Sequence, residues 1–370
     1  MSVLLPILLS SAAACGLTVI LAAALLVVEK LLVNRGTCVV DVNDGERKLE
    51  VTGGRSVLTT LTDEGIFIPS ACGGRGTCSY CMLKMTAGAG PLSPTEMPLL
   101  TAEEIERGLR ISCQVKVRND LAVTIPAELL SVREYRGVVE RIRDLTGDIK
   151  ELRIRLVEPE AIDFTAGQYI QLRAPAYGDN PDPVYRAYSI SSPPSARDGI
   201  ELIVRLVPGG ICTTWIFTML TEGDEVVFNG PYGEFRLSEA GGPMIWIAGG
   251  SGMAPFWSMV RHMKQTGHAR PCTYFFGAVR ERDLFFTDEL KALARELPWF
   301  SYVPALSGPA ESNGWTGETG LITEVVDRHV REAGDLEAYL CGSPGMIAAA
   351  AAVLHAKGIG EQRMYYDKFE

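Results

Sequence analysis

The sequence predicts a multidomain protein that consists of a transmembrane helix, an α+β domain, an antiparallel β-barrel and an α/β domain with a parallel sheet. Three patterns carry this prediction: an uncharged apolar run at the start, short strands with few helices in the middle, and alternating strands and helices in the last part. With 370 residues, the chain is long enough for two or three domains. We place the four segments at residues 1–35, 36–130, 131–240 and 241–370.

The first segment is predicted to be a single-pass membrane anchor. The run from Val3 to Val28 contains no charged residue, and about 20 apolar residues suffice to cross a bilayer. A cleavable signal peptide is the alternative, but no Lys or Arg precedes the run, and such peptides usually begin with basic residues. Lys30 and Arg35 follow the run, and basic residues stay on the cytoplasmic side, so the remaining domains should face the cytoplasm.

Charge and cysteine content exclude two classes of protein. The chain has 45 acidic and 35 basic residues, and its net charge of −10 argues against a nucleic-acid partner, because phosphate binding needs clustered Lys and Arg. The nine Cys are spread unevenly over a long chain, which does not fit the disulfide framework of a small secreted domain. We therefore expect the soluble domains to lie in a reducing compartment.

The second segment should begin with a β-hairpin and a short helix. Cys38–Val42 and Lys48–Val51 alternate apolar and polar residues on the two sides of an Asn-Asp-Gly turn. Ser56 is a suitable N-cap for the helix that follows, and Gly65 is a suitable stop signal.

The loop after this helix predicts a [2Fe–2S] cluster. Cys72, Cys78 and Cys81 lie on one glycine-rich loop, and Cys113 follows much later. Such a cluster needs four thiolates, two for each iron, and loop glycines can take the backbone angles that wrap it. A zinc site is the alternative, but zinc ribbons pair two short Cys-x-x-Cys units, and Cys72 and Cys113 are not paired in this way.

The third segment is predicted to be a small β-barrel with an anion-binding turn. Arg186-Ala187-Tyr188-Ser189 ends one strand, and the stretch Gly209–Thr214 opens a helix whose N-terminus suits a pyrophosphate. The other predicted strands are Val138–Ile142, Lys150–Leu156, Tyr169–Leu172 and Leu202–Val207.

The fourth segment alternates strands and helices, as in a parallel sheet covered by helices. The apolar strand Met244–Ala248 leads into the glycine-rich turn Gly249–Pro255 and then into a helix. Tyr274–Ala278 is a second strand and Tyr339–Cys341 a third, before an alanine-rich helix that ends near Lys357. Glycines at a strand-to-helix turn let a dinucleotide phosphate approach the backbone.

In this order and spacing, the motifs of the third and fourth segments resemble the ferredoxin–NADP reductase superfamily. The resemblance implies FAD as cofactor, with Arg186 at the flavin phosphate, Tyr188 stacked on the isoalloxazine and Ser189 near flavin N5. The remaining flavin-binding residues that it implies are Ala187, Gly210 and Thr213, the last two at the pyrophosphate.

The same resemblance implies a nicotinamide site. Cys341 and Ser251 would help to place the reactive carbon, and Phe369 near the C-terminus would cover the flavin until the nicotinamide displaces it. No dense basic cluster for a 2′-phosphate is apparent, which favours NADH over NADPH. The residues expected to bind the dinucleotide are Gly249, Gly250, Gly252, Met253, Gly342 and Pro344.

With the anchor and the cysteine loop added, the chain resembles the family of F subunits of sodium-translocating NADH:quinone reductases. Cys113-Gln114-Val115 also matches, although the family's long insertion before Arg186 is absent. The resemblance implies a ferredoxin-like β-grasp fold for residues 36–130. It further implies an NADH:acceptor oxidoreductase that passes electrons through FAD and the cluster to integral-membrane redox subunits or to quinone, in the inner membrane of a bacterium.

Two other hypotheses remain open. A reductase component of a multicomponent oxygenase would share the three soluble modules, but the predicted anchor argues against it. A non-catalytic, membrane-tethered electron-transfer adaptor would lack the flavin or the nicotinamide motifs, and both are present.

Overall fold

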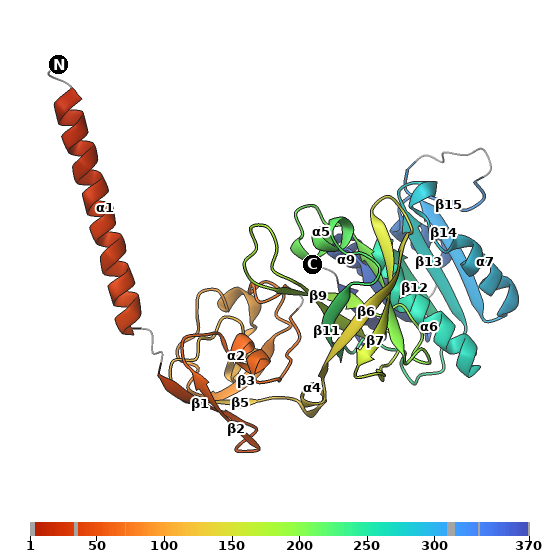
Figure 1. Ribbon diagram of the computed structural model, residues 1–370. Helices are drawn as coiled ribbons and strands as arrows, with labels where there is room; N and C mark the ends of the chain where they lie inside the picture. Colours follow the sequence, from red (N-terminus) through yellow and green to blue (C-terminus); the bar gives the residue numbers. More distant parts are fainter. Residues whose placement is uncertain (1–3, 33–35, 71, 309–314, 332–333, 369–370) are drawn as a thin grey trace. The chain divides into compact units, whose positions relative to one another are not determined.

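The computed structural model describes residues 4–32, 36–70, 72–308, 315–331 and 334–368 (Figure 1). The chain forms two compact units. The first comprises Met1–Ile68 and Gly74–Leu130, and the second comprises Pro69–Gly73 and Ser131–Glu370. Most of the predicted cluster-binding segment therefore belongs to the first unit, and both predicted nucleotide-binding segments belong to the second.

The first element is helix α1 (Leu4–Leu32). Several of its apolar side chains are exposed, among them Leu17, Val19 and Ile20. Among the residues that the structure describes, no helix combines the length and the hydropathy that a bilayer crossing requires. The transmembrane anchor predicted for residues 1–35 is therefore not confirmed.

The rest of the first unit is built on a five-stranded sheet in the order β2-β1-β5-β3-β4. Strands β1 (Thr37–Val42) and β2 (Arg47–Thr52) form the predicted hairpin. Its turn residues Asn43 and Asp44 both have a φ of 54°, the left-handed conformation that tight hairpin turns favour. The remaining strands are β3 (Met82–Ala87), β4 (Leu109–Ile111) and β5 (Leu121–Thr124).

The predicted helix lies against this sheet as α2 (Val57–Asp63). Ser56 is its N-cap, since its side chain accepts a hydrogen bond from the backbone N–H of Thr59 at 3.2 Å. Val57 and Leu61 are fully buried in the same core as the strands. The shorter helices of this unit are η1 (Met97–Leu99), α3 (Ala102–Glu106) and α4 (Ala127–Leu130).

The second unit begins with a six-stranded antiparallel sheet in the order β10-β7-β6-β11-β8-β9. A bridge between Ile190 and Leu202 brings the end of β9 beside β10, so the sheet closes toward the predicted barrel. The elements are β6 (Arg133–Asp144), β7 (Ile149–Glu158), β8 (Tyr169–Ala174), β9 (Val184–Ser189), β10 (Gly199–Arg205), α5 (Ile211–Thr218) and β11 (Glu225–Tyr232).

A six-stranded parallel sheet follows, in the order β15-β14-β13-β12-β16-β17. Along β12 (Met244–Gly249), Trp246 and Ala248 join a core that includes residues of α6 and α7, whereas Ile245 and Ile247 join a core that includes residues of α8 and α9. Helices therefore cover both faces, as predicted.

The elements of this sheet and its connections are η2 (Gly250–Gly252), α6 (Met253–Thr266), β13 (Cys272–Ala278), η3 (Glu281–Asp283), α7 (Thr287–Glu296), β14 (Phe300–Leu306), β15 (Glu318–Thr319), α8 (Ile322–His329), β16 (Glu337–Gly342), α9 (Pro344–Ala356), η4 (Glu361–Arg363) and β17 (Met364–Lys368).

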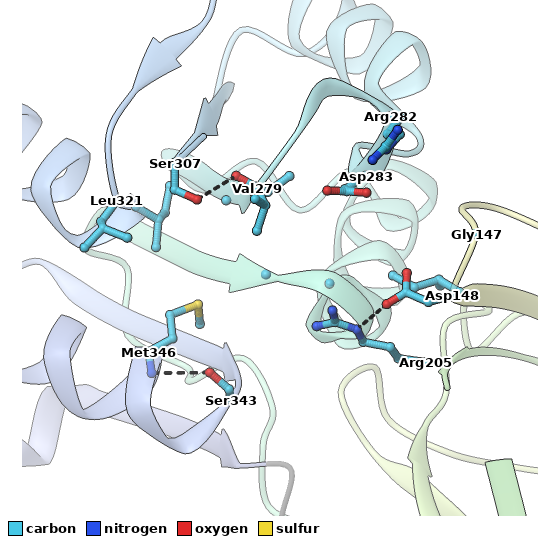
Figure 2. Close-up of a pocket in the computed structure, with 16 residues that line it drawn as sticks. Gly147, Asp148, Arg205, Val279, Arg282, Asp283, Ser307, Leu321, Ser343 and Met346 are labelled. Atoms are coloured by element: carbon cyan, nitrogen blue, oxygen red, sulfur yellow. Dashed lines mark hydrogen bonds and ion pairs between the residues drawn. The ribbon is translucent and has the colours of Figure 1, made fainter. Parts of the chain in front are cut away.

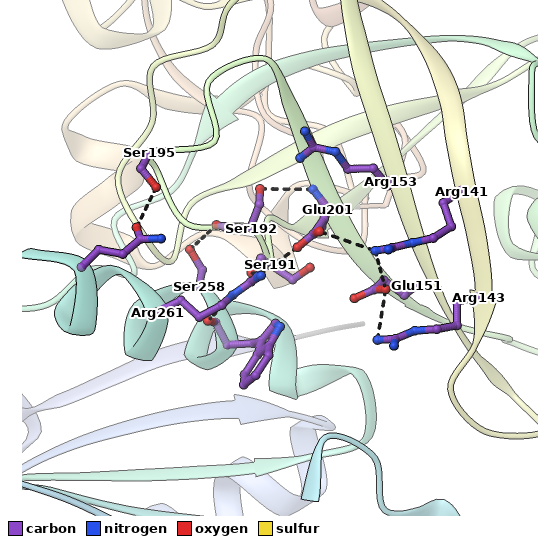
Figure 3. Close-up of polar contacts among 12 residues, drawn as sticks. Arg141, Arg143, Glu151, Arg153, Ser191, Ser192, Ser195, Glu201, Ser258 and Arg261 are labelled. Carbon is purple, nitrogen blue, oxygen red and sulfur yellow. Dashed lines mark hydrogen bonds and ion pairs between the residues drawn. The ribbon is translucent and has the colours of Figure 1, made fainter. Parts of the chain in front are cut away.

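Polar contacts fasten helix α6 to the barrel (Figure 3). The Arg261 guanidinium lies 2.9 Å from the Glu201 carboxylate and stands over the Trp257 ring. Ser258 Oγ donates a hydrogen bond to the Ser192 carbonyl at 2.6 Å. Since Ser192 follows closely after β9 and α6 begins at the glycine-rich turn, these contacts fix the two predicted nucleotide motifs relative to each other.

Candidate functional site

The carboxyl ends of the parallel strands open into a cavity of about 660 Å³ (Figure 2). Five of its lining residues lie at or just after these strand ends, namely Gly249 at the end of β12, Gly250 after it, Gly277 in β13, Ser307 after β14 and Ser343 after β16. Open α/β sheets bind ligands outside the carboxyl ends of their strands, where helix N-termini can meet a phosphate. The cavity is therefore placed to receive a dinucleotide.

The glycine-rich turn lies against the end of strand β16. A Cβ at Gly252 would stand 2.3 Å from the Cys341 carbonyl oxygen, which is closer than non-bonded atoms approach. Only glycine lets the turn come this near to Cys341. Met253 is fully buried at the start of α6, and Ser251 lies on the same turn but does not line the cavity.

The segment Cys341-Gly342-Ser343-Pro344 joins the end of β16 to the start of α9. Pro344 occupies the first turn of this helix, and Ser343 Oγ accepts a hydrogen bond from the Met346 N–H at 3.4 Å. Gly342 ends β16 beside Met346, since a Cβ there would lie 2.7 Å from its methyl carbon. The segment thus closes the cavity on the side of β16.

Two charged residues of the barrel that the sequence analysis missed also line the cavity. Arg205 Nε lies 2.8 Å from Asp148 Oδ2, and Arg205 is close to Gly250, where an added Cβ would be 3.4 Å from its Nη1. Burial alone would raise the pKa of Asp148, but hydrogen bonds from Arg205 and Thr146 hold it below its usual value. A guanidinium beside a glycine-rich turn suits a nucleotide phosphate. The sequence did contain a signal for Arg205, because this residue ends a strand and stands three positions before the Pro-Gly-Gly turn.

Strand β9 carries the predicted flavin residues. The Tyr188 hydroxyl is buried beside the Cys212 thiol, and burial, together with this thiol, raises the pKa of Tyr188 well above the ordinary value. The Arg186 side chain is half-buried, and its guanidinium donates a hydrogen bond to the Tyr185 carbonyl at 2.7 Å. Ala187, the next residue of the strand, is also half-buried. A half-buried guanidinium and a half-buried Tyr ring on one strand fit a group such as FAD, which carries phosphates and a planar ring system.

The turn before α5 fits the pyrophosphate of the same group. Gly210 is the N-cap of this helix and provides no side-chain cap, so the first N–H groups have no partner from a capping side chain. Thr213 Oγ1 accepts a hydrogen bond from the Val207 N–H at 3.2 Å and so holds the turn against the helix. A Cβ at Gly210 would lie 2.6 Å from Thr213 Oγ1, and this crowding explains the glycine.

The structure adds a residue that joins the two predicted sites, Asp367 on β17. Its carboxylate accepts a hydrogen bond from Ser189 Oγ at 2.8 Å and one from Cys341 Sγ at 3.8 Å. Cys341 is directly opposite Asp367 in the pairing of β16 with β17. The predicted flavin strand and the predicted nicotinamide strand therefore meet at one carboxylate.

Burial raises the pKa of Asp367 to about 6, against the lowering effect of the bonds from Ser189 and Cys341. Burial likewise raises the pKa of the Cys341 thiol, and the Asp367 charge raises it further, so this thiol stays protonated. The sequence pointed to Asp367 only weakly, as the one acidic residue of the strand that contains Tyr365 and Tyr366. Phe369, the predicted flavin cover, lies outside the described residues.

Three of the four predicted cluster ligands, Cys78, Cys81 and Cys113, lie buried in the first unit. Cys81 and Cys113 share a side-chain hydrogen bond, and this bond together with burial raises the pKa of Cys81. Two thiols this close would both ionise only beside a cation, so the pair suits a cluster iron.

Cys72 lies in the stretch Pro69–Gly73 of the second unit, and its position relative to the other three cysteines is not described. Among the described residues, no group of three or more His, Cys, Asp or Glu is gathered closely enough to hold a metal ion. The set of four cysteine ligands therefore stays a prediction.

Three known domain families match successive parts of the chain. They are the 2Fe-2S iron-sulfur cluster binding domain at residues 40–118, the oxidoreductase FAD-binding domain at residues 136–237 and the oxidoreductase NAD-binding domain at residues 246–352. The predicted cofactors FAD and [2Fe–2S] and the predicted substrate NADH are thus confirmed.

The chain is similar over almost its whole length to known subunits of one enzyme. It is 32% identical to the F subunit of the Na(+)-translocating NADH-quinone reductase of Klebsiella pneumoniae, over 95% of this chain and 97% of that protein. The F subunit of the same enzyme of Neisseria meningitidis is 33% identical, over 95% of this chain and 96% of its own length.

Solved structures share the fold. The cytochrome P450 reductase GcoB of Amycolatopsis superposes with a TM-score of 0.72 at 29% identity, over 90% of this chain and 99% of that chain. The ferredoxin reductase in carbazole 1,9a-dioxygenase gives a TM-score of 0.67 at 23% identity, also over 90% and 99%, which supports the fold alone.

Proposed function

Since the chain belongs to the family of F subunits of Na(+)-translocating NADH-quinone reductases, we propose that it oxidises NADH and passes the electrons to a membrane-bound acceptor. The observation that carries this proposal is the contact of Ser189 and Cys341 with Asp367, which joins the flavin strand to the nicotinamide strand. FAD, when bound, accepts the hydride of NADH and releases the electrons singly to the [2Fe–2S] cluster.

The barrel holds the flavin through a short set of residues. Arg186 binds its phosphate, the Tyr188 ring lies against the isoalloxazine, and Ser189 lies near N5. Gly210 and Thr213 bring the N-terminus of α5 to the pyrophosphate, which the positive end of the helix stabilises. The buried Tyr188 hydroxyl and the uncapped helix support this arrangement.

The cavity at the parallel sheet holds NADH. Gly249 and Gly250, at the start of the glycine-rich turn, receive the phosphates, and Arg205 adds a positive charge from the barrel side. Cys341 and Ser251 place the reactive carbon.

Asp367 fixes the side chains on both sides of the reacting centre. Above its pKa of about 6 the carboxylate is ionised and accepts the hydrogen bonds of Ser189 and Cys341. Side chains held in one conformation lower the entropic cost of bringing donor and acceptor together. Asp367 acts here as a positioning residue.

Cys72, Cys78, Cys81 and Cys113 hold the cluster, and residues 1–35 attach the protein to the inner membrane with its domains in the cytoplasm. The uncharged run and the exposed apolar side chains of α1 support this attachment. Integral-membrane redox subunits receive the electrons, with quinone as the final acceptor in a sodium-translocating complex, as the names of the relatives suggest.

Anaerobic addition of NADH to the detergent-purified full-length protein tests this function. We expect the flavin absorbance to bleach and the electron paramagnetic resonance (EPR) signal of a reduced [2Fe–2S] cluster to appear. We expect quinone reduction once the membrane subunits are added. Colourless protein without iron or flavin, or flavin that NADH does not reduce, would contradict the proposal.

The flavin assignment has its own test. We expect Tyr188→Ala to lower the ratio of bound flavin to protein, because the ring that stacks on the isoalloxazine is lost. Tyr185→Phe is the control, since Tyr185 lies on the same strand and its hydroxyl contacts Glu134 at 3.3 Å. Equal flavin content in both variants would remove Tyr188 from the site.

Delivery of electrons to an oxygenase is a second candidate function. The 29% identity to a cytochrome P450 reductase over 90% of this chain favours it. The two functions differ in the acceptor, so isolation of the protein with its native partners separates them. Recovery with membrane redox subunits supports the first function, and recovery with a soluble oxygenase supports the second.

A further inference from the structure

Gln114 donates a hydrogen bond to the sulfur of a predicted cluster ligand. Its Nε2 lies 3.3 Å from Cys113 Sγ, within the first unit. The side chain is half-buried, whereas Cys113 is buried. An N–H group that points at a thiolate sulfur stabilises negative charge there.

A second residue fixes the orientation of the Gln114 amide. Thr95 Oγ1 donates a hydrogen bond to Gln114 Oε1 at 3.1 Å. An amide has an oxygen that only accepts and a nitrogen that only donates. Because Thr95 occupies the oxygen, the nitrogen is the end that faces Cys113.

The backbone at Thr95 is held in place by the contacts of its neighbour Glu96. The next residue, Glu96, is fully buried and lies 2.8 Å from the Arg110 guanidinium. Its carboxylate also accepts the backbone N–H groups of Ser93 at 3.0 Å and of Ile111 at 3.2 Å. Burial would raise the pKa of Glu96, but the bonds from Arg110 and Ser93 hold it below its usual value, so it stays ionised. The turn that carries Thr95 is therefore held beside the strand that leads to Cys113.

The cysteine loop can pass close to the Gln114 amide because it has a glycine, Gly76, at the point of contact. A Cβ at Gly76 would lie 2.5 Å from Gln114 Nε2 and 2.7 Å from its Cδ. The φ of Gly76 is +74°, a conformation that other residues rarely adopt. The loop and the Gln114 side chain are thus in direct contact.

We propose that Gln114, oriented by Thr95, sets the reduction potential of the [2Fe–2S] cluster through its hydrogen bond to the Cys113 sulfur. Reduction adds one negative charge to the cluster, so a donor at a ligand sulfur favours the reduced form and raises the potential. The inference rests on the proposed function, because it needs Cys113 as a ligand. Gln114 does not bind iron itself; it stabilises negative charge on the cluster through the Cys113 sulfur.

The test compares variants of the full-length protein by redox titration, with the EPR signal of the reduced cluster as the readout. We expect Gln114→Leu to lower the midpoint potential. Gln114→Glu should lower it further, because a carboxylate adds negative charge to the loss of the donor. Thr95→Val should cause a smaller shift in the same direction, because the amide can then rotate.

Thr86→Val is the matched control, since Thr86 lies in the same unit and its exposed hydroxyl donates to the Ala122 carbonyl at 3.5 Å. Its potential should equal that of the unchanged protein. If the clusters of Gln114→Leu and Thr95→Val keep the original potential, the inference is wrong. Should Gln114→Leu lose its cluster, Thr95→Val and Gln114→Glu decide the question by the same measurement.

Iron and sulfide analysis separates this inference from the proposed function. If Cys113→Ala retains a full complement of iron and sulfide, Cys113 is not a ligand, and the ligand assignment fails together with the inference. If Cys113→Ala loses the cluster and Gln114→Leu keeps both the cluster and its potential, the ligand assignment stands and only the inference fails.

Discussion

The cluster loop and the hydride-transfer site are assembled from very different lengths of chain. At the cluster, Gln114 donates to its direct neighbour Cys113, and Cys78 and Cys81 belong to one short loop. At the hydride site, the hydrogen bond between Ser189 and Asp367 joins residues that are 178 positions apart. Most of the first site is therefore encoded by one short loop, with Cys113 added from later in the chain. The second site exists only once two domains and the C-terminal strand have folded together.

This difference predicts how each site should fail. A change at a cysteine should remove one cofactor and leave the other unit intact. A change near Asp367 should leave both cofactors in place and slow the reaction between them, because such a residue governs relative position.

The largest expected effect is that of Cys78→Ala. We expect the [2Fe–2S] cluster and all transfer to one-electron acceptors to be lost, because a ligand is missing. NADH oxidation with an artificial two-electron acceptor should continue. If flavin reduction by NADH also stopped while flavin remained bound, the order of the carriers would be wrong.

The next effect is that of Asp367→Asn on hydride transfer. We expect flavin reduction by NADH, followed by stopped-flow absorbance, to slow by about 100-fold, since small displacements of reacting groups cost this much. The original protein should also lose rate as the pH falls through about 6, and the variant should not. Asp327→Asn is the control, because Asp327 is an exposed residue of the same unit and pairs with Lys357 at 2.7 Å. Equal rates in both variants would show that Asp367 does not position the site.

A smaller effect is expected for Gly252→Ala. The new Cβ would meet the Cys341 carbonyl at 2.3 Å, so the glycine-rich turn must move away from β16. We expect the KM for NADH to rise by about 10-fold, while the bound FAD is retained. Gly241→Ala is the control, since a Cβ there has nothing within 4 Å. An unchanged KM in Gly252→Ala would show that the turn does not set the affinity for NADH.

The last prediction concerns stability and does not involve the reaction rate. Burial favours the protonated form of Asp367, so its contribution to stability is fully present below pH 3.8 and is lost as the pH rises through about 6. Asparagine has no charge, so the variant avoids the free-energy cost of ionising a buried carboxyl group. We expect thermal unfolding at pH 8 to show Asp367→Asn more stable by up to about 3 kcal/mol, with the gap shrinking at pH 5. A variant that is less stable at pH 8 would contradict this account.

Much of the fold followed from local patterns. The hairpin of β1 and β2, the Ser56 cap of α2 and the parallel sheet were predicted correctly, because turn residues, caps and hydrophobic alternation act over short stretches. The predicted anchor at residues 1–35 was not confirmed in the part of the chain that the structure describes. Asp367, Arg205 and the role of Thr95 were missed, since none of them lies in a recognisable motif.

The sequence by itself determined which cofactors this protein binds, because three of the four cysteines and the glycine-rich turns lie in short motifs that can be recognised locally. Only the tertiary structure decided which side chains surround them. Asp367 reaches Ser189, and Thr95 reaches Gln114, through strand pairing and a buried ion pair. Such contacts depend on the geometry of packed elements, and no local run of residues records that geometry.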